Sequence, residues 1–595
     1  MNIKSKTEIF LTSNFGVIIF FIISFIVFCF RNLDPIAYPT LYAEDGVWTS
    51  DLINNGFYDT AFNTRLFPIL GFVVFYKMGL IIIEFFFNGN ILYLPFVYFI
   101  LSNLFLSLLV VLTFRIFSKY LSLSSCLFIT AFILLLPVGN DSNEIFGRIL
   151  NLGFIFPVLQ VVLLAELCRP NISKSSILAI TMFSGISGLT FPIGLGISSI
   201  FIVYISYLSL KSKSKINYII SMILLIAPIF IFVVSFNNDA FLNKGGADLP
   251  FKIESFVEFA IARSIIYPLV FHFYNHLNDF MVFIVLTLSA GFLIILTIRQ
   301  YKCNGNNRII SLSLVLWSCF LLYLSTMIVM RSGLTYIFDS YSSTFPDRYF
   351  TGLNLLFILC LTFTMDSFNK KRYIYFLLLL PVLSTASKRF ELAEPEMKMD
   401  SVLPWTLAIC SAETNHETLL VKIDIPPKGW SMLMPKNLLA DAKRTNCSNM
   451  PFYNIYPLTK LQPPVLFYPN FMPSVSTTNL KNVKVNNSID LTGELDTFTV
   501  EVTGSDPSLL FSLESEKNNE KYSFISFTLI SNIEGNLQVY YKLYDDPEFS
   551  ESKSLLIPIK KGENNINLSF FNSVIKDGIR LDFPDIMNYK YSIMM

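Results

Sequence analysis

Long apolar runs alternate with short polar connections over the first two thirds of the chain. About 20 apolar residues in a helix cross the hydrocarbon core of a bilayer, and most of these runs are near that length. The pattern therefore predicts an α-helical polytopic membrane protein with about eleven transmembrane helices. The predicted spans lie at about 9–30, 91–114, 121–138, 149–168, 174–191, 193–210, 216–236, 279–298, 309–330, 347–367 and 373–387.

The basic connections between the runs predict orientation, because Lys and Arg collect in cytoplasmic loops. These connections lie at 115–119, 169–174, 211–215, 299–308 and 370–372. If they face the cytoplasm, the N-terminus is cytoplasmic and the outer loops are 31–90, 139–148, 237–278 and 331–346. This alternation of cytoplasmic and outer loops is consistent only if the apolar segment 66–87 does not cross the membrane. We therefore expect that segment to be juxtamembrane or re-entrant within a large first outer loop.

The composition changes at about residue 388, where charged residues, Asn, Ser and Pro become frequent. Beyond it, 525–529 and 537–543 alternate apolar and polar positions, as strands with one buried face do. Turn residues at 533–536, 561–564 and 577–578 separate the runs. We therefore expect two domains, a transmembrane domain over 1–387 and a β-rich, β-sandwich-like extracytoplasmic domain over 388–595.

The composition of the chain indicates which partners to expect. The chain is 53% hydrophobic and 15% charged, against about 25% charged in soluble proteins, and its net charge is +1. Without a basic stripe, nucleic acid is not an expected partner, whereas the lipid bilayer is. Cys410 and Cys447 are the cysteines in polar sequence. The sequence leaves open whether they are bonded, since a disulfide requires that they meet in space.

The predicted outer loops collect acidic residues, arginines and aromatic residues near the membrane surface. Charged groups at a bilayer are costly and call for a functional explanation. The candidates are the pair Glu44 and Asp45 with the aromatic neighbours Tyr42 and Trp48, a second cluster with Asp141 and Glu144, and the basic group Arg148, Arg331 and Arg348 with Tyr349.

These residue types together indicate glycosyl transfer from a lipid-linked phosphate. Arginine binds phosphate bidentately and keeps its charge when partly desolvated, so we assign Arg348, with Arg148 or Arg331 and Tyr349, to the donor phosphate. A carboxylate can take the proton of an attacking hydroxyl. We expect Asp45 slightly more than Glu44 to be this base, with Glu44 orienting the substrate. The remaining candidates, Tyr42, Trp48, Asp141 and Glu144, would contact the sugar or the acceptor.

The layout resembles the GT-C class of integral-membrane glycosyltransferases. Both have a first helix, an acidic first outer loop, many further spans and an outer soluble domain, and Glu44-Asp45 matches the acidic pair of that class. In layout the chain looks most like bacteriophage-type serotype-converting glucosyltransferases. That resemblance implies inverting transfer of a hexose, glucose first, from an undecaprenyl-phosphate-linked donor to the O-antigen of lipopolysaccharide, on the periplasmic side of the bacterial inner membrane.

No metal site and no certain cofactor is inferred, because the acidic pair is contiguous Glu-Asp rather than a spaced Asp-x-Asp. A divalent cation nevertheless stays open. His272 and His276 are spaced as metal ligands on one helix face would be, but the sequence offers no third ligand beside them. Packed or solvated histidines are the expectation there.

Three other functions stay open. An O-antigen polymerase would also have outer arginines, but it would not need the β-rich tail. A flippase or other transporter of lipid-linked sugar would be expected to show internal repeats, and the sequence shows none. An acyltransferase would use a membrane histidine, for which His272 and His276 are the candidates.

Overall fold

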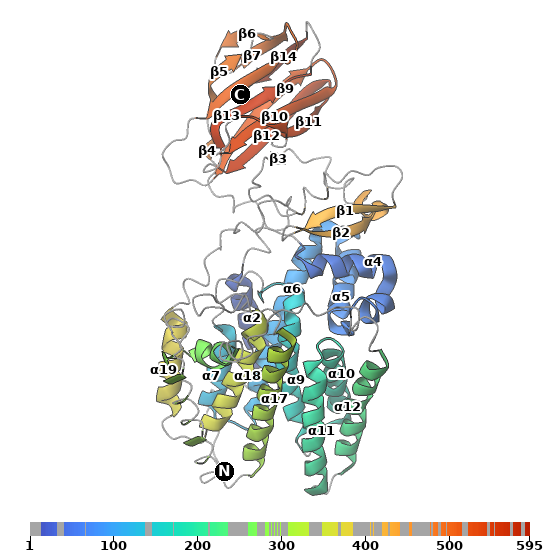
Figure 1. Ribbon diagram of the computed structural model, residues 1–595, viewed down its shortest axis with the longest axis vertical. Coiled ribbons are helices and arrows are strands. Elements are labelled where there is room, and N and C mark those ends of the chain that lie inside the picture. The colour runs from blue at the N-terminus through green and yellow to red at the C-terminus, as the bar shows by residue number, and fades with distance from the viewer. Residues whose placement is uncertain are drawn as a thin grey trace. The chain divides into compact units, whose positions relative to one another are not determined.

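The computed structural model divides into two compact units (Figure 1). Unit 1 comprises 1–35, 44–89 and 94–394, and unit 2 comprises 36–43, 90–93 and 395–595. The structure describes residues 13–32, 41–65, 67–136, 145–169, 172–211, 215–235, 260–269, single positions within 280–298, 307–331, 348–366, 371–384, 405, 409, 419–425, 429–440, 452–454, 476–477, 480–485, 489–494, 497–513, 522–543, 548–551, 554–571, 575–584 and 589–594.

Unit 1 is a helical bundle in its described residues. Most of its helices are uniformly apolar, as expected for elements surrounded by lipid and by one another. Two of its short elements are not α-helical, since η2 (Leu150–Phe154) is 3₁₀-helical and η3 (Ala262–Ile266) is π-helical. A further 3₁₀ turn, η1 (Ile91–Tyr93), belongs to unit 2. The α-helices are α2 (Asn14–Arg31), α4 (Glu44–Phe62), α5 (Leu70–Phe87), α6 (Leu94–Phe117), α7 (Leu123–Leu134), α9 (Phe156–Leu167), α10 (Lys174–Gly188), α11 (Ile193–Lys211), α12 (Lys215–Ser235), α17 (Asn307–Arg331), α18 (Arg348–Met365) and α19 (Lys371–Ser384).

The described helices confirm a multi-pass membrane architecture. Six are long and apolar enough to cross a bilayer, namely Leu70–Phe87, Ile91–Phe117, Ile193–Lys211, Lys215–Ser235, Ile309–Ile328 and Arg348–Met365, and three shorter apolar helices accompany them. On α12, Ile223, Phe230 and Val234 are more than half exposed. Such a face is stable in lipid and not in water. The total of eleven spans, their orientation and a non-crossing 66–87 remain predictions.

The N-terminus of α5 joins the C-terminal end of α10. The amide of Leu70 donates to the carbonyl oxygen of Leu189 at 3.1 Å, and the amide of Gly71 donates to Thr190 Oγ1 at 2.6 Å. A Cβ on Gly71 would lie 2.4 Å from that hydroxyl. The glycine therefore allows the two helix ends to meet, and Figure 1 shows α5 beyond the end of α10.

Helix α18 is the central helix of unit 1, with 94% of its span buried among its neighbours. It packs on α17, α7, α9, η2 and η3. The closest approach is at Gly352, where a Cβ would lie 2.0 Å from the carbonyl oxygen of Phe154 and 2.8 Å from Tyr323 Oη. Tyr323 Oη also donates to that carbonyl at 2.9 Å. This contact fixes the first turns of α18 against η2.

In its described residues, unit 2 contains two β-sheets and a small hairpin of β1 with β2, so the β-rich expectation is confirmed. The sheets run in the orders β11-β10-β13-β8-β5 and β3-β12-β9-β14-β7-β6, with β4 beside β9. The strands are β1 (Leu420–Ile425), β2 (Trp430–Pro435), β3 (Phe452–Asn454), β4 (Ser476–Thr477), β5 (Leu480–Val485), β6 (Ile489–Glu494), β7 (Thr497–Val502), β8 (Ser508–Leu513), β9 (Tyr522–Ser531), β10 (Gly535–Leu543), β11 (Ser554–Ile559), β12 (Gly562–Phe571), β13 (Ile575–Asp582) and β14 (Lys590–Met594).

The turns of unit 2 carry the chain from one sheet to the other. The segment 532–534 joins β9 to β10, and 560–561 joins β11 to β12, and in each case the two strands belong to different sheets. The predicted alternation holds, because Leu529, Leu537 and Val539 are fully buried. Crossing connections and a shared apolar interior are typical of a β-sandwich.

We predict that Gly352→Ala destabilises the bundle. The added methyl group meets a backbone carbonyl that cannot rotate away, and overpacking of this kind costs about 1–3 kcal/mol or more. The measurement is the thermal unfolding of the purified protein in detergent. Gly291→Ala is the matched control, since a Cβ there meets nothing within 4 Å. Equal melting temperatures for the two variants would contradict this packing.

Candidate functional site

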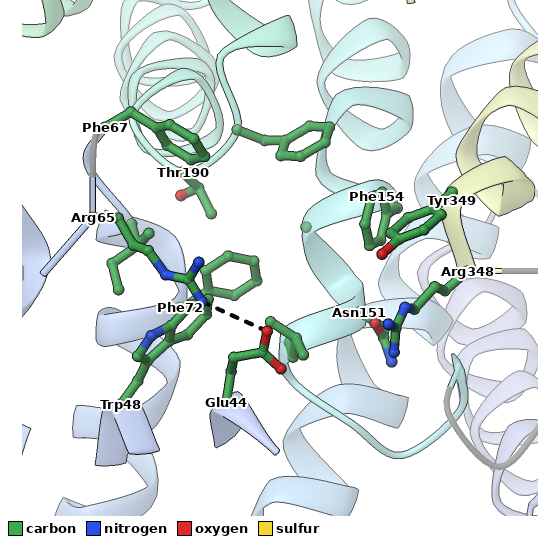
Figure 2. Close-up of a pocket in the computed structure, with 14 residues that line it drawn as sticks. Glu44, Trp48, Arg65, Phe67, Phe72, Asn151, Phe154, Thr190, Arg348 and Tyr349 are labelled. Carbon is green, nitrogen blue, oxygen red and sulfur yellow. Dashed lines mark ion pairs between the residues drawn. The ribbon is translucent and has the colours of Figure 1, made fainter. Parts of the chain in front are cut away.

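A cavity of about 190 Å³ in unit 1 brings predicted site residues together. Its walls come from α4, the loop before α5, α5 itself, η2, the end of α10 and the start of α18. Figure 2 shows Arg65 and Trp48 on one side of Glu44, and Arg348 with Asn151 on the other. The lining residues are Glu44, Trp48, Arg65, Phe67, Ile69, Phe72, Leu150, Asn151, Gly153, Phe154, Thr190, Phe191, Arg348 and Tyr349.

Glu44 is the carboxylate in the lining of this cavity. It is the first residue of α4, where the partial positive charge of the helix N-terminus favours a carboxylate. Its Oε1 lies 3.6 Å from a guanidinium nitrogen of Arg65. The Arg65 guanidinium also lies over the Trp48 ring, 5.0 Å from the centroid. Glu44 therefore faces the cavity with one loosely held counter-ion.

Asp45, its neighbour, is buried and holds the surrounding elements together. Its side chain is 3% exposed. Oδ1 accepts a hydrogen bond from Tyr76 Oη in α5 at 2.7 Å and another from the amide of Leu150 in η2 at 2.9 Å. One carboxylate oxygen thus ties α4 to two other walls of the cavity. Thr49, four residues later in α4, donates a hydrogen bond to the carbonyl oxygen of Asp45. Its hydroxyl oxygen also lies 2.9 Å from that of Tyr98, which extends the network to α6.

Burial has the largest effect on the pKa of Asp45. Loss of solvation raises its pKa to about 6, against 3.8 for an ordinary Asp, because the charged form is disfavoured away from water. The hydrogen bond from Tyr76, the charge of Arg148 and the Leu150 amide partly oppose this rise, and the charge of Glu44 adds to it. Asp45 consequently titrates close to neutral pH.

The segment that leads into η2 is held by the end of α2. The Arg31 guanidinium lies 4.0 Å from the centroid of the Phe146 ring, and Asn32 Nδ2 donates to the Phe146 carbonyl oxygen at 2.7 Å. At the cavity itself, Gly153 allows the Phe72 ring to approach, since a Cβ there would lie 2.4 Å from that ring. These contacts set the position of η2 and its cavity residues.

The rest of the cavity wall is mainly aromatic. Trp48 and Phe72 have ring centroids 5.2 Å apart, and the Phe154 ring contacts both Phe191 and Tyr349 with centroids at 5.3 Å. The Thr190 hydroxyl accepts from the Gly71 amide and donates to the carbonyl oxygen of Ile186. A ligand here would meet flat apolar surfaces with a few polar groups at the edges, as is typical of small-molecule sites.

The structure brings some predicted site residues together and leaves others apart. Glu44, Trp48, Arg348 and Tyr349 line one cavity, and Asp45 lies directly behind it. Arg148 is buried and close enough to act electrostatically on Asp45.

The remaining predicted residues either lie elsewhere in the described structure or fall outside it. Arg331 is the last residue of α17, and its side chain lies outside the described residues. Tyr42 belongs to unit 2. Outside the described residues are Asp141, Glu144, His272, His276, Cys410 and Cys447.

Sequence reasoning missed several cavity residues. Arg65 was recognisable as a lone arginine in an acidic outer loop. Its pairing with Glu44 was not, because the two residues are 21 positions apart and are brought together only by the fold of α4 and the residues after it. Asn151 and Thr190 carry no motif at all. In the described part of the chain, no group of three His, Cys, Asp or Glu side chains is placed to hold a metal ion.

The chain was compared with family models, with curated protein sequences and with solved structures. No family model matches the chain, and no curated protein sequence matches it. Among solved structures, the cryo-electron microscopy structure of the arabinosyltransferase EmbB from Mycobacterium smegmatis aligns with a TM-score of 0.32 and 9% identity, covering 100% of this chain. The alignment covers 65% of EmbB, so the present chain matches less than two thirds of that protein's length.

We predict that Asp45 makes stability decrease as pH rises. Its folded pKa of about 6 lies above the unfolded value near 3.8. The folded state therefore holds the proton more tightly, and the stability it contributes is complete below pH 3.8 and lost as pH rises through 6. The difference is about 3 kcal/mol. Melting temperatures in detergent from pH 5 to 7.5 should fall more for the wild type than for Asp45→Asn, and parallel profiles would contradict the assignment.

Proposed function

We propose that the chain is a GT-C-like membrane glycosyltransferase that takes a sugar from a polyprenyl-phosphate donor. The observation that carries this proposal is a small cavity that sets one carboxylate, Glu44, between two arginines, Arg65 and Arg348. Together these groups supply a base for a hydroxyl nucleophile and cations for a phosphate leaving group. The aromatic walls suit a sugar ring or the first units of an isoprenoid chain.

We assign the base to Glu44 rather than to Asp45, reversing the slight preference drawn from the sequence. Glu44 lines the cavity, whereas Asp45 is 3% exposed and turns Oδ1 toward Tyr76 and Leu150. A general base must come within hydrogen-bonding reach of the proton it removes. Asp45 then acts as a positioning residue, which keeps α4, α5 and η2 in register around the ligand.

The reaction is a single displacement. The oxygen of an acceptor hydroxyl attacks the anomeric carbon of the donor sugar while its proton passes to Glu44. The bond between the anomeric carbon and the phosphate oxygen breaks, and its electron pair leaves with the polyprenyl phosphate. Attack on the face opposite the leaving group inverts the anomeric centre. No covalent sugar–enzyme intermediate is formed.

Arg348 is the principal phosphate ligand in this proposal. Its guanidinium stands at the N-terminus of α18, opposite Glu44 in the cavity (Figure 2). Arginine stabilises the charge that develops on a departing phosphate oxygen. The neighbouring Tyr349 ring flanks the same wall, with the Arg348 guanidinium carbon 5.3 Å from its centroid. Arg148, which is buried two residues before η2 and acts electrostatically on Asp45, adds positive potential near the cavity.

The finer proposal names the substrates. By resemblance of layout, the donor is an undecaprenyl-phosphate-linked hexose, with glucose as the first choice. The acceptor is the O-antigen of lipopolysaccharide, reached on the periplasmic side of the inner membrane. Unit 2 would lie on that side and contact the acceptor polysaccharide.

We predict that Glu44→Gln abolishes transfer. Loss of a general base lowers the rate by about 10²–10⁴-fold, and the amide preserves the shape of the side chain. The measurement is transfer of radiolabelled sugar from a polyprenyl-phosphate donor in reconstituted vesicles.

Glu166→Gln is the matched control for this variant. Glu166 is also an acidic partner of arginine, at 2.5 Å from Arg169, but it does not line the cavity. Full activity of Glu44→Gln would remove Glu44 from the chemistry. Translocation of the intact donor lipid without transfer would favour the flippase alternative over any transferase.

We predict that Arg348→Gln raises the KM for the donor and lowers kcat. The guanidinium is proposed to bind the phosphate before reaction and to hold it more strongly as its charge grows, so both constants should change by about tenfold or more. Arg348→Lys keeps the charge and should recover part of the activity. An unchanged KM in both variants would show that the donor phosphate binds elsewhere.

A further inference from the structure

Arg65 lines the cavity beside Glu44 but has no individual role in the proposed reaction. It follows α4 in the chain and returns to the first turn of the same helix. There its guanidinium pairs with Glu44 at 3.6 Å and stacks over Trp48 at 5.0 Å (Figure 2). The carboxylate assigned as the base is therefore engaged by a cation in this structure.

The charges in the cavity lining favour an anionic ligand. The lining contains one carboxylate side chain, Glu44, and two guanidinium side chains, Arg65 and Arg348. An incoming phosphate ester offers Arg65 a bidentate partner, which a single carboxylate oxygen at 3.6 Å does not. The phosphate and Glu44 therefore compete for the same guanidinium.

The pair between Arg65 and Glu44 is suited to exchange. Its side chains are 39% and 24% exposed, and the separation exceeds ordinary hydrogen-bonding distance. Ion pairs with that exposure contribute little to stability. Asp45 contrasts with this arrangement, because it is buried and holds two short hydrogen bonds. Of the two neighbouring carboxylates, Glu44 is thus the one whose partner can change at low cost.

We propose that Arg65 transfers from Glu44 to the phosphate of the donor when the donor binds. This inference rests on the proposed function and adds an order of binding to it. Before the donor arrives, Arg65 covers Glu44. Once the phosphate holds Arg65 together with Arg348, Glu44 is open to the acceptor hydroxyl. The donor therefore binds first, and the base becomes available only when a sugar is in place.

Trp48 provides a direct probe of this exchange. A guanidinium over an indole ring perturbs it electrostatically, so removal of Arg65 from the ring should change the Trp48 emission. The full-length protein in detergent micelles is titrated with a short polyprenyl monophosphate, and tryptophan fluorescence is recorded. We expect a saturable change in the wild type and loss of that change in both Trp48→Phe and Arg65→Gln. Direct binding of the same polyprenyl monophosphate in radiolabelled form should be at least about tenfold weaker in Arg65→Gln than in the wild type.

Arg169→Gln is the matched control for Arg65→Gln. Arg169 is 37% exposed and pairs with a glutamate, as Arg65 does, but it lies outside the cavity lining. It should titrate like the wild type. Equal affinities in Arg65→Gln and the wild type would overturn the exchange. Because Arg65 is half-exposed, its replacement leaves the buried packing intact.

Two further ligands identify the source of the phosphate. Inorganic phosphate that produces the same change, even at higher concentration, supports the exchange with the phosphate group alone as the recognised feature. Phosphatidylglycerol that matches the polyprenyl phosphate overturns the donor-first order, since ordinary membrane lipid would then hold Arg65 at all times.

Kinetics separate this inference from the proposed function. If the wild type transfers sugar by an ordered mechanism with the donor first, Arg65→Gln should change to random order with a raised donor KM. Sugar transfer in the wild type with an unchanged order and KM in Arg65→Gln would overturn the exchange alone. A Trp48 response through Arg65 without any sugar transfer would overturn the proposed function and leave the exchange standing.

Discussion

The arrangement of the cavity depends on the buried carboxylate of Asp45. One of its oxygens accepts hydrogen bonds from Tyr76 and from the amide of Leu150, and so joins α4, α5 and η2. Burying a carboxylate costs free energy unless hydrogen bonds compensate it. The hydrogen bonds to Asp45 offset only part of that cost, so its pKa stays raised, at about 6. The same hydrogen bonds are directional, so they place three walls of the cavity relative to one another.

This constraint explains why two adjacent carboxylates have different surroundings. Neighbouring residues at the start of a helix point about 100° apart, so only one of the pair can face the cavity when the other faces the interior. Asp45 is held by short contacts, and Glu44 by a loose pair with Arg65. This combination suits a substrate-binding site, because Asp45 keeps the geometry of the cavity while the ion pair of Glu44 can be exchanged.

The bundle supplies the remaining walls through close helix contacts. Gly71, Gly153 and Gly352 each stand where a methyl group would collide with a neighbour, and each lies at or near the cavity. Small residues allow helix backbones to approach inside a membrane, where the hydrophobic effect does not drive association. The start of α18, with Arg348 and Tyr349, approaches η2 closely in this way at Gly352.

Local patterns in the sequence determined the class of fold, because the length of an apolar run and the alternation of a strand are set by nearby residues alone. They predicted the helical membrane part, the β-rich region seen in β9 and β10, and the loop residues Glu44 and Arg348 as neighbours of a ligand site. Only the tertiary structure decided that Asp45 is buried and Glu44 exposed to the cavity, that Arg65 returns to Glu44, and that Asn151 and Thr190 contribute. These relations join α4 to residues about 20 to 150 positions away. Their physical basis is packing between helices, which no local pattern of residues encodes.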